Sequence, residues 1–216
     1  MLKRFRPVRK TRRAILIEKM KGPASWPGAA DQALLRFLRT RGHDPVTETA
    51  MKGLGFSGEY GAVWMAIGAG AAAADRRRRS RWLGAALVAP AAIVLNYGVK
   101  RTVGRQRPVI TDHPALAKAP SKLSFPSAHA TSSVAAATAL ARVEPGARAP
   151  LYALAAAICV GRPYLGMHYP SDVLAGAALG HALGKLAPLP REGRDERIGE
   201  RPQATPPEPA PVAAPA

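Results

Sequence analysis

Cysteine, acidic side chains and aromatic side chains are all scarce in this chain of 216 residues. Cysteine occurs once, at Cys159 within an apolar run, so neither an internal disulfide nor a metal site built from several thiolates can form. Aromatic residues make up 6% of the chain and are not interleaved with basic residues, so no nucleic-acid partner is expected. The apolar stretch 14–17 that follows the basic start is too short for a cleavable signal peptide.

Basic residues, in contrast, are abundant and clustered. The chain has 32 Lys and Arg against 14 Asp and Glu, a formal net charge of +18. Alanine-rich apolar runs separate the clusters, and apolar runs that end at arginine clusters are typical of membrane proteins. These runs lie near the lower limit of about 17–25 residues for crossing a bilayer, so a soluble helical bundle is the alternative. The fold that we expect is all-α, a polytopic membrane bundle with about five transmembrane helices, at residues 56–74, 82–99, 127–143, 150–164 and 170–185.

Three polar clusters interrupt the apolar sequence between residues 100 and 172. The first runs from Lys100 to Pro108, the second from Phe125 to Ser133 and the third from Gly161 to Asp172. Together they offer cations, two histidines, one carboxylate and a helix start after Pro-Ser, whose free N–H groups can bind an anion. This set of groups suits one task, which is to hold a tetrahedral phosphate and transfer it through a histidine.

The three clusters resemble the signature motifs of the type 2 phosphatidic acid phosphatase family. The family pattern is Lys, six residues, Arg-Pro; then Pro-Ser-Gly-His; then Ser-Arg, five residues, His, three residues, Asp. The sequence departs from it at two positions, with Ala128 in place of Gly and Gly161 in place of Ser. The residues that match are Lys100, Arg107, Pro108, Pro126, Ser127, His129, Arg162, His168 and Asp172.

The resemblance implies a lipid phosphatase that hydrolyses a phosphomonoester or pyrophosphate through a phosphohistidine, with no metal and no cofactor. It implies that His168 is the nucleophile, that Asp172 fixes the tautomer of His168, and that His129 acts as general acid and base. The residues implied to bind the phosphate are Lys100, Arg107, Ser127, Ala128 and Arg162.

The stretch 125–133 and the short N-terminus are similar to the branch of the family that includes decaprenylphosphoryl-phosphoribose phosphatases, which serve cell-wall precursor synthesis. Undecaprenyl pyrophosphate, phosphatidylglycerol phosphate and phosphatidic acid are alternative substrates. A vanadate-dependent haloperoxidase would share the anion site, but membrane spans disfavour it. A non-enzymatic basic membrane anchor is a further alternative, although it would have no need of both His129 and His168.

The chain divides into four expected parts. Nine of the first 22 residues are Lys or Arg, and anionic lipid head groups would attract them. Asp31 to Thr40 reads as an amphipathic helix that is too short to span a bilayer. The parts are a basic N-terminal tail, residues 1–30, an interfacial amphipathic segment, 31–55, the transmembrane catalytic domain, 56–188, and a disordered tail rich in proline and alanine, 189–216.

The first polar cluster is expected to continue the helix before it as far as Pro108. Helical periodicity then puts Lys100, Gly104 and Arg107 on one face. Arg101 and Arg105 fall on another face, where we expect contacts with solvent or lipid head groups.

With five spans, the three clusters share one membrane face, and the arginine-rich loop 76–81 lies on the other. Basic loops stay in the cytoplasm, so the sequence predicts a multi-pass plasma-membrane protein whose active site faces the extracytoplasmic side. The basic N-terminus conflicts with this orientation, because five spans would put it outside as well.

Overall fold

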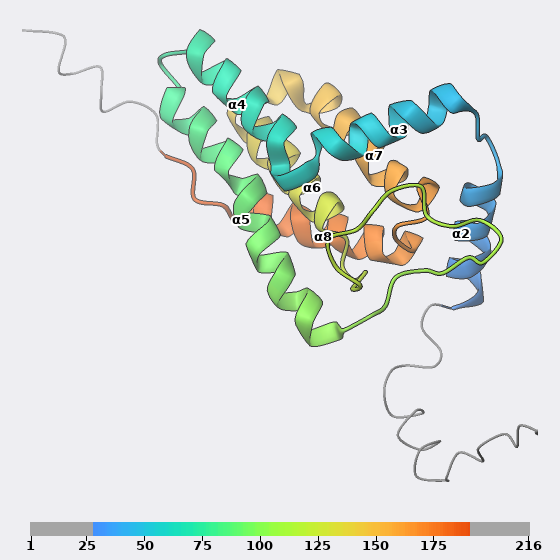
Figure 1. Ribbon diagram of the computed structural model, residues 1–216. Coiled ribbons are helices and arrows are strands. Elements are labelled where there is room, and N and C mark those ends of the chain that lie inside the picture. Colours follow the sequence, from blue (N-terminus) through green and yellow to red (C-terminus); the bar gives the residue numbers. More distant parts are fainter. Residues whose placement is uncertain (1–27, 191–216) are drawn as a thin grey trace, which may run out of the picture.

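The computed structural model describes residues 28–190, which form a bundle of helices (Figure 1). Within this range the extended structure is limited to one isolated bridge, between Gln106 and Leu123. Most of both predicted tails lies outside the described residues. The elements are α2 (Ala29–Thr40), α3 (Pro45–Ser57), the 3-10 turn η1 (Glu59–Gly61), α4 (Ala62–Ala74), α5 (Arg79–Val103), α6 (Ala128–Val143), the 3-10 turn η2 (Pro145–Ala147), α7 (Arg148–Tyr164) and α8 (Pro170–Leu186).

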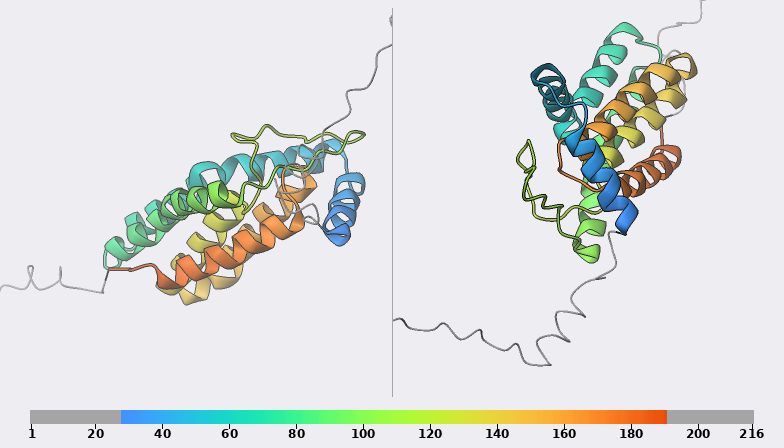
Figure 2. Two further views of the ribbon diagram at one scale, coloured as in Figure 1. Left: turned by 90° about the horizontal axis from the view of Figure 1, so that it is seen from below. Right: turned by 90° about the vertical axis from the view of Figure 1, so that its right-hand side faces the viewer.

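The central helix of the bundle is α6, which packs against α5, α7 and α8 (Figures 1 and 2). Its residues are mostly Ala, Ser and Thr, and nearly all of them are buried. On the facing side of α8, glycine recurs every fourth residue, at Gly176, Gly180 and Gly184. A Cβ built on Gly180 would lie 2.3 Å from the carbonyl oxygen of Thr131, so only glycine allows this approach. Small residues at a spacing of four are typical of closely packed membrane helices.

The helices are short for a membrane bundle. Of the helices in the described range, Arg79–Val103 is the one that is long and apolar enough to cross a membrane. Helices α4, α6, α7 and α8 have 13 to 17 residues. Their length is about 20–26 Å at the usual helical rise, against a hydrocarbon core of roughly 30 Å. The all-α fold is confirmed for the described residues. Because four of the helices are this short, the five crossings stay a prediction.

The chain before α4 differs from the sequence-based expectation. An additional helix, α3, occupies part of the predicted interfacial segment, and the side chain of Asp44 caps it by accepting the N–H groups of Val46 and Thr47. The predicted span 56–74 is interrupted, because Tyr60 has a φ of 53° and Gly61 a φ of 79°. The sharp turn at these two residues redirects the chain, and α4 begins only at Ala62.

The predicted helix through the first polar cluster is also shorter than expected. It ends at Val103, because Gly104 adopts a left-handed conformation with φ 67°. Residues 104–127 then form a long loop that covers one end of the bundle, while α2 lies across the ends of α7 and α8 (Figure 2). The ends of α5, α6, α7 and α8 that carry the three polar clusters thus come together under this loop.

Candidate active site

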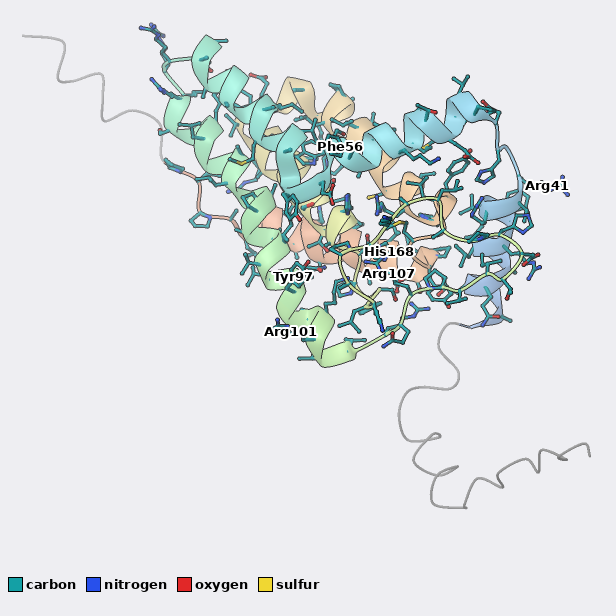
Figure 3. The ribbon with its side chains drawn as sticks, viewed as in Figure 1. Arg41, Phe56, Tyr97, Arg101, Arg107 and His168 are labelled. Atoms are coloured by element: carbon teal, nitrogen blue, oxygen red, sulfur yellow. The ribbon has the colours of Figure 1, made fainter. Side chains whose placement is uncertain are left out.

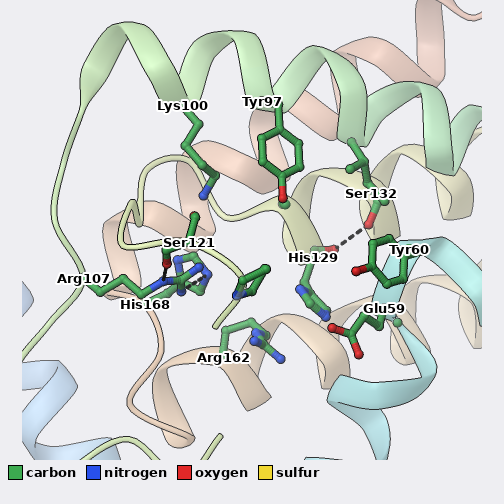
Figure 4. A pocket seen from close by; sticks show the side chains of 14 residues that line it. Glu59, Tyr60, Tyr97, Lys100, Arg107, Ser121, His129, Ser132, Arg162 and His168 are labelled. Carbon is green, nitrogen blue, oxygen red and sulfur yellow. Dashed lines mark hydrogen bonds between the residues drawn. The ribbon is translucent and has the colours of Figure 1, made fainter. Parts of the chain in front are cut away.

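Residues from all three polar clusters line one cavity. Its volume is about 60 Å³, several times the roughly 10–15 Å³ that a single water molecule requires on this measure. Half of the residues that line it belong to the clusters, and Figure 4 shows their side chains converging on it. The predicted site residues on its wall are Lys100, Arg107, Ala128, His129, Arg162 and His168.

His168 is buried in the loop between α7 and α8, and its two ring nitrogens have different neighbours. An Nη1 of Arg107 lies 3.0 Å from Nε2, and Oδ2 of Asp172 lies 3.6 Å from Nδ1. Arginine can only donate a hydrogen bond, so Nε2 must be the acceptor and the ring proton lies on Nδ1, toward Asp172. Catalytic contacts as long as 3.6 Å in a ligand-free site often tighten when substrate binds.

The charge state of His168 follows from its surroundings. Burial lowers the pKa of His168 well below its usual range, and the neighbouring cations act in the same direction. The imidazole is therefore neutral at physiological pH, with a lone pair on the nitrogen that faces the cavity. Its lone pair accepts from Arg107 at Nε2, and the imidazole can act as a nucleophile once Arg107 donates to a phosphate oxygen instead.

The cations of the first cluster are held by backbone carbonyls. Lys100, at the end of α5, directs Nζ at the carbonyl oxygens of Leu123 and Ser124, at 3.3 and 3.4 Å. Arg107 comes from the loop after α5 and not from a helix, and it donates to the carbonyl oxygens of Ser121 and Met167 at 2.8 and 2.7 Å. It lies beside His168, whereas Arg101 projects from the outer side of α5, as expected (Figure 3). Neutral carbonyls position both cations without cancelling their charge.

Arg162, at the end of α7, packs against α3, the helix that was not predicted from the sequence. It is 5% exposed, and its Nε has no hydrogen-bond partner among residues 28–190. A Cβ built on Gly55 of α3 would lie 2.8 Å from its Nη1. The guanidinium therefore occupies space that a glycine leaves open, with donor capacity left for an anion.

The start of α6 forms the wall nearest the third cluster. Ser127 is fully buried and is the N-cap, with its Oγ 3.5 Å from the N–H of Ala130. Its own N–H donates to the carbonyl oxygen of Asp172, which joins the second cluster to the third. Ala128 follows at the first helical position and lines the cavity. The first N–H groups of a helix lack partners within it and favour an anion, so this terminus can contact a phosphate.

His129 approaches the cavity from a different side than His168 (Figure 4). Its Nε2 lies 3.0 Å from the carbonyl oxygen of Gly55. A carbonyl only accepts, so Nε2 carries a proton that points toward α3. Among the described residues, no group of three His, Cys, Asp or Glu side chains is placed to hold a metal ion.

The structure corrects one residue and adds others. Arg105 was expected at the surface, but it is 9% exposed and contacts Asp172, because the chain leaves the helix at Gly104 and turns inward. Glu59, Tyr60 and Tyr97 also line the cavity. Tyr97 could have been found from the sequence, since it lies one helical turn before Lys100. Glu59 had no such signal, because its place depends on the turn at Tyr60.

These features match a known family. The PAP2 superfamily profile matches residues 49–192, and the chain belongs to this superfamily, which confirms the resemblance to type 2 phosphatidic acid phosphatases. The decaprenylphosphoryl-5-phosphoribose phosphatase of Mycolicibacterium smegmatis is 39% identical over 154 residues, which cover 69% of this chain and 82% of that protein. The chain is a lipid phosphatase and a phosphoric ester hydrolase.

Two solved structures share the fold. One is a transmembrane PAP2-type phosphatidylglycerolphosphate phosphatase from Bacillus subtilis, with a TM-score of 0.62 and 24% identity, over 80% of this chain and 89% of that one. The other is LpxE of Aquifex aeolicus, with a TM-score of 0.59 and 23% identity, over 74% of this chain and 94% of that one. The fold is thus that of membrane PAP2 phosphatases.

The contact between Gly55 and Arg162 gives a first prediction. In Gly55→Ala the new methyl group displaces the guanidinium, so kcat/KM should fall about tenfold, as expected for weakened stabilisation of the transition-state charge. The inhibition constant of inorganic phosphate should rise as well. The matched control is Gly53→Ala in the same helix, where a Cβ meets nothing within 4 Å. Both changes should stabilise α3 by about 1 kcal/mol, because alanine favours a helix more than glycine does. The two variants therefore differ only in the contact with Arg162, and equal activity would contradict the role given to Gly55.

Proposed function

We propose that the chain hydrolyses the phosphomonoester of a polyprenyl-linked lipid through a phosphohistidine on His168. The observation that carries this proposal is the arrangement around His168, with the lone pair of Nε2 inside a cavity lined by buried cations and the Nδ1 proton toward Asp172. Cations around a phosphate offset the charge that repels a nucleophile.

The proposed reaction has two steps. In the first, Nε2 of His168 forms a bond to phosphorus while the bond from phosphorus to the alkoxide breaks, and His129, which gains a proton on Nδ1 when the phosphate anion binds, gives that proton to the leaving oxygen. In the second, neutral His129 takes a proton from water, whose oxygen attacks phosphorus and releases inorganic phosphate and free His168. Asp172 stabilises the imidazolium character of His168 in both steps, and Lys100 and Arg162 hold the phosphoryl oxygens.

The division of labour between the histidines can be tested by trapping the intermediate. His168→Ala should abolish turnover and covalent label, because no nucleophile remains. His129→Ala should slow turnover by about 10²–10⁴-fold yet still accumulate label, most clearly with a nitrophenyl phosphate, whose leaving group needs little protonation. The measurement is rapid alkaline quench with radiolabelled substrate. Label on His168→Ala but not on His129→Ala would mean that the roles are reversed.

For the substrate, we propose a phosphoribose carried by a polyprenyl phosphate, as named for the mycobacterial relative. Glu59 supports this choice over a pyrophosphate. Its carboxylate lies at the cavity with the ring of Tyr60 beside it (Figure 4). A carboxylate repels a second phosphate group, but it accepts hydrogen bonds from sugar hydroxyls.

Substrate preference should therefore depend on Glu59. The wild type should release phosphate faster from decaprenylphosphoryl-phosphoribose than from undecaprenyl pyrophosphate. Glu59→Gln should narrow this ratio about tenfold, because it removes the charge and weakens a hydrogen bond to a charged acceptor. Glu48→Gln, on α3 and paired with Lys52, is the matched control and should change nothing. Faster pyrophosphate hydrolysis by the wild type would contradict the proposed substrate.

We also propose a multi-pass topology with the active site on the extracytoplasmic side. The arginine-rich turn between α4 and α5 lies at the opposite end of the bundle from the site (Figure 1). Arg78 of this turn pairs with Asp75 at 2.6 Å and with Glu144 at 3.0 Å, beside the turn between α6 and α7. Positively charged turns favour the cytoplasm. The basic N-terminal residues precede α2, which lies at the active-site end, so they oppose this assignment.

The topology can be tested by labelling two single cysteines in a Cys159→Ala background. Ser80 and Thr111 are both exposed and belong to opposite ends of the bundle. A membrane-impermeant maleimide on intact cells should label Thr111→Cys and not Ser80→Cys, because only the site end faces outward. The cysteine-free chain is the control. The opposite labelling pattern would put the active site in the cytoplasm.

A further inference from the structure

A buried ionic network lies behind the pair formed by His168 and Asp172. Arg105 donates from Nη1 to Oδ1 of Asp172 at 2.6 Å and from Nη2 to Oδ2 of Asp31 at 2.8 Å. All three side chains are at most 9% exposed. The guanidinium also lies over the ring of Tyr169, with 4.3 Å from its central carbon to the ring centroid. Arg105 is therefore held between two carboxylates and does not line the phosphate cavity.

Asp31 fixes this network to the start of α8. Its Oδ1 accepts the N–H of Ser171 at 2.9 Å, and its Oδ2 accepts the hydroxyl of Ser171. That hydroxyl in turn accepts from Arg105 at 2.8 Å. Burial alone would raise the pKa of Asp31, but the hydrogen bonds from Ser171 and Arg105 hold it below its ordinary value. Asp31 is thus ionised and neutralises the side of Arg105 that faces away from Asp172.

The two oxygens of Asp172 have separate partners as a result. Oδ1 accepts from Arg105, whereas Oδ2 accepts the N–H of Tyr169 at 2.9 Å and faces Nδ1 of His168. A fully buried carboxylate with both oxygens held cannot rotate. Arg105 on one oxygen and the N–H of Tyr169 on the other therefore set together which oxygen faces the imidazole.

We propose that Arg105 is a positioning residue for phosphoryl transfer, which orients the carboxylate of Asp172, and that Asp31 orients Arg105. This inference rests on the proposed role of His168 as nucleophile. It makes α2 part of the support of the active site, although α2 precedes the residues 49–192 that match the family. Partners that orient a directly acting residue typically contribute about 10–100-fold to activity.

Conservative variants test the proposal, because deleting Arg105 would leave buried carboxylates without a cation. Arg105→Lys keeps the charge but loses the planar fork that contacts both carboxylates. It should lower kcat and the rate of phosphohistidine formation about 10–100-fold. The KM and the inhibition constant of inorganic phosphate should stay within about twofold, since Arg105 does not line the cavity. Asp31→Asn should lower kcat in the same way but less, and the double variant should resemble Arg105→Lys alone, because both act through Asp172.

The matched control is a second ion pair between α2 and the same loop. Arg36 and Asp112 are 2.7 Å apart but 62% and 51% exposed. Arg36→Lys and Asp112→Asn should leave kcat and phosphohistidine formation unchanged, which separates positioning from the attachment of α2.

The proposal is overturned if Arg105→Lys keeps the wild-type rate of phosphohistidine formation. It is also overturned if kcat falls only together with thermal stability in detergent and with phosphate affinity, as a purely structural role requires. If Arg105→Lys does not fold, Asp31→Asn decides by the same measurements. A wild type that forms no phosphohistidine overturns the proposed function and this inference together.

Discussion

The structure depends on how it buries several cations around one cavity before any anion is present. A buried charge is strongly destabilising unless polar groups satisfy it. Carboxylates would satisfy these cations but would also cancel the charge that a phosphate needs. At Lys100 and Arg107 the chain uses backbone carbonyls instead, from residues 121–124 and from Met167. Most of these carbonyls come from the long loop 104–127, because the carbonyls inside a helix are committed to the helix's own hydrogen bonds.

The same constraint explains why the carboxylates of Asp31 and Asp172 lie away from the cavity. Asp31 and Asp172 neutralise Arg105, which lies behind the nucleophile and not at the cavity. The cations of the site therefore fall into two groups with different partners. Cations held by neutral carbonyls face the substrate, and a cation held by carboxylates orients the residue that supports His168. Lys100 and Arg105 carry the same formal charge but have different tasks, because Lys100 contacts carbonyls and Arg105 contacts carboxylates.

The sequence predicted the parts of this arrangement that are local. Helices α6 and α8 begin where Ser127 and Pro170 indicated, since capping residues and proline act within one turn. Motif spacing predicted the histidines and the cations at the cavity, but not Glu59, Tyr60 or Tyr97. The prediction of a helix through the first cluster was wrong, because Gly104 ends the helix. The predicted surface position of Arg105 was wrong for the same reason. Its contact with Asp31 joins residues 74 positions apart, and no periodicity within either segment signals it. Helix α3 had a signal in Asp44-Pro45, but Gly53 and Gly55 weaken its helical pattern.

The position of the site at the helix ends has a consequence for a lipid substrate. A phosphate group stays at head-group depth, because moving its charge into hydrocarbon is prohibitively unfavourable. In the proposed multi-pass topology, the short helices α6, α7 and α8 bring their ends to that depth, so a cavity that they build with the end of α5 would meet the phosphate without lifting the lipid from the bilayer. The cavity is also lined by Ile93 and Tyr97 of α5 and by Tyr60 at the turn before α4. These apolar and amphipathic side chains would offer the prenyl chain of the proposed substrate a lateral path into the membrane, while the phosphate reaches the cations.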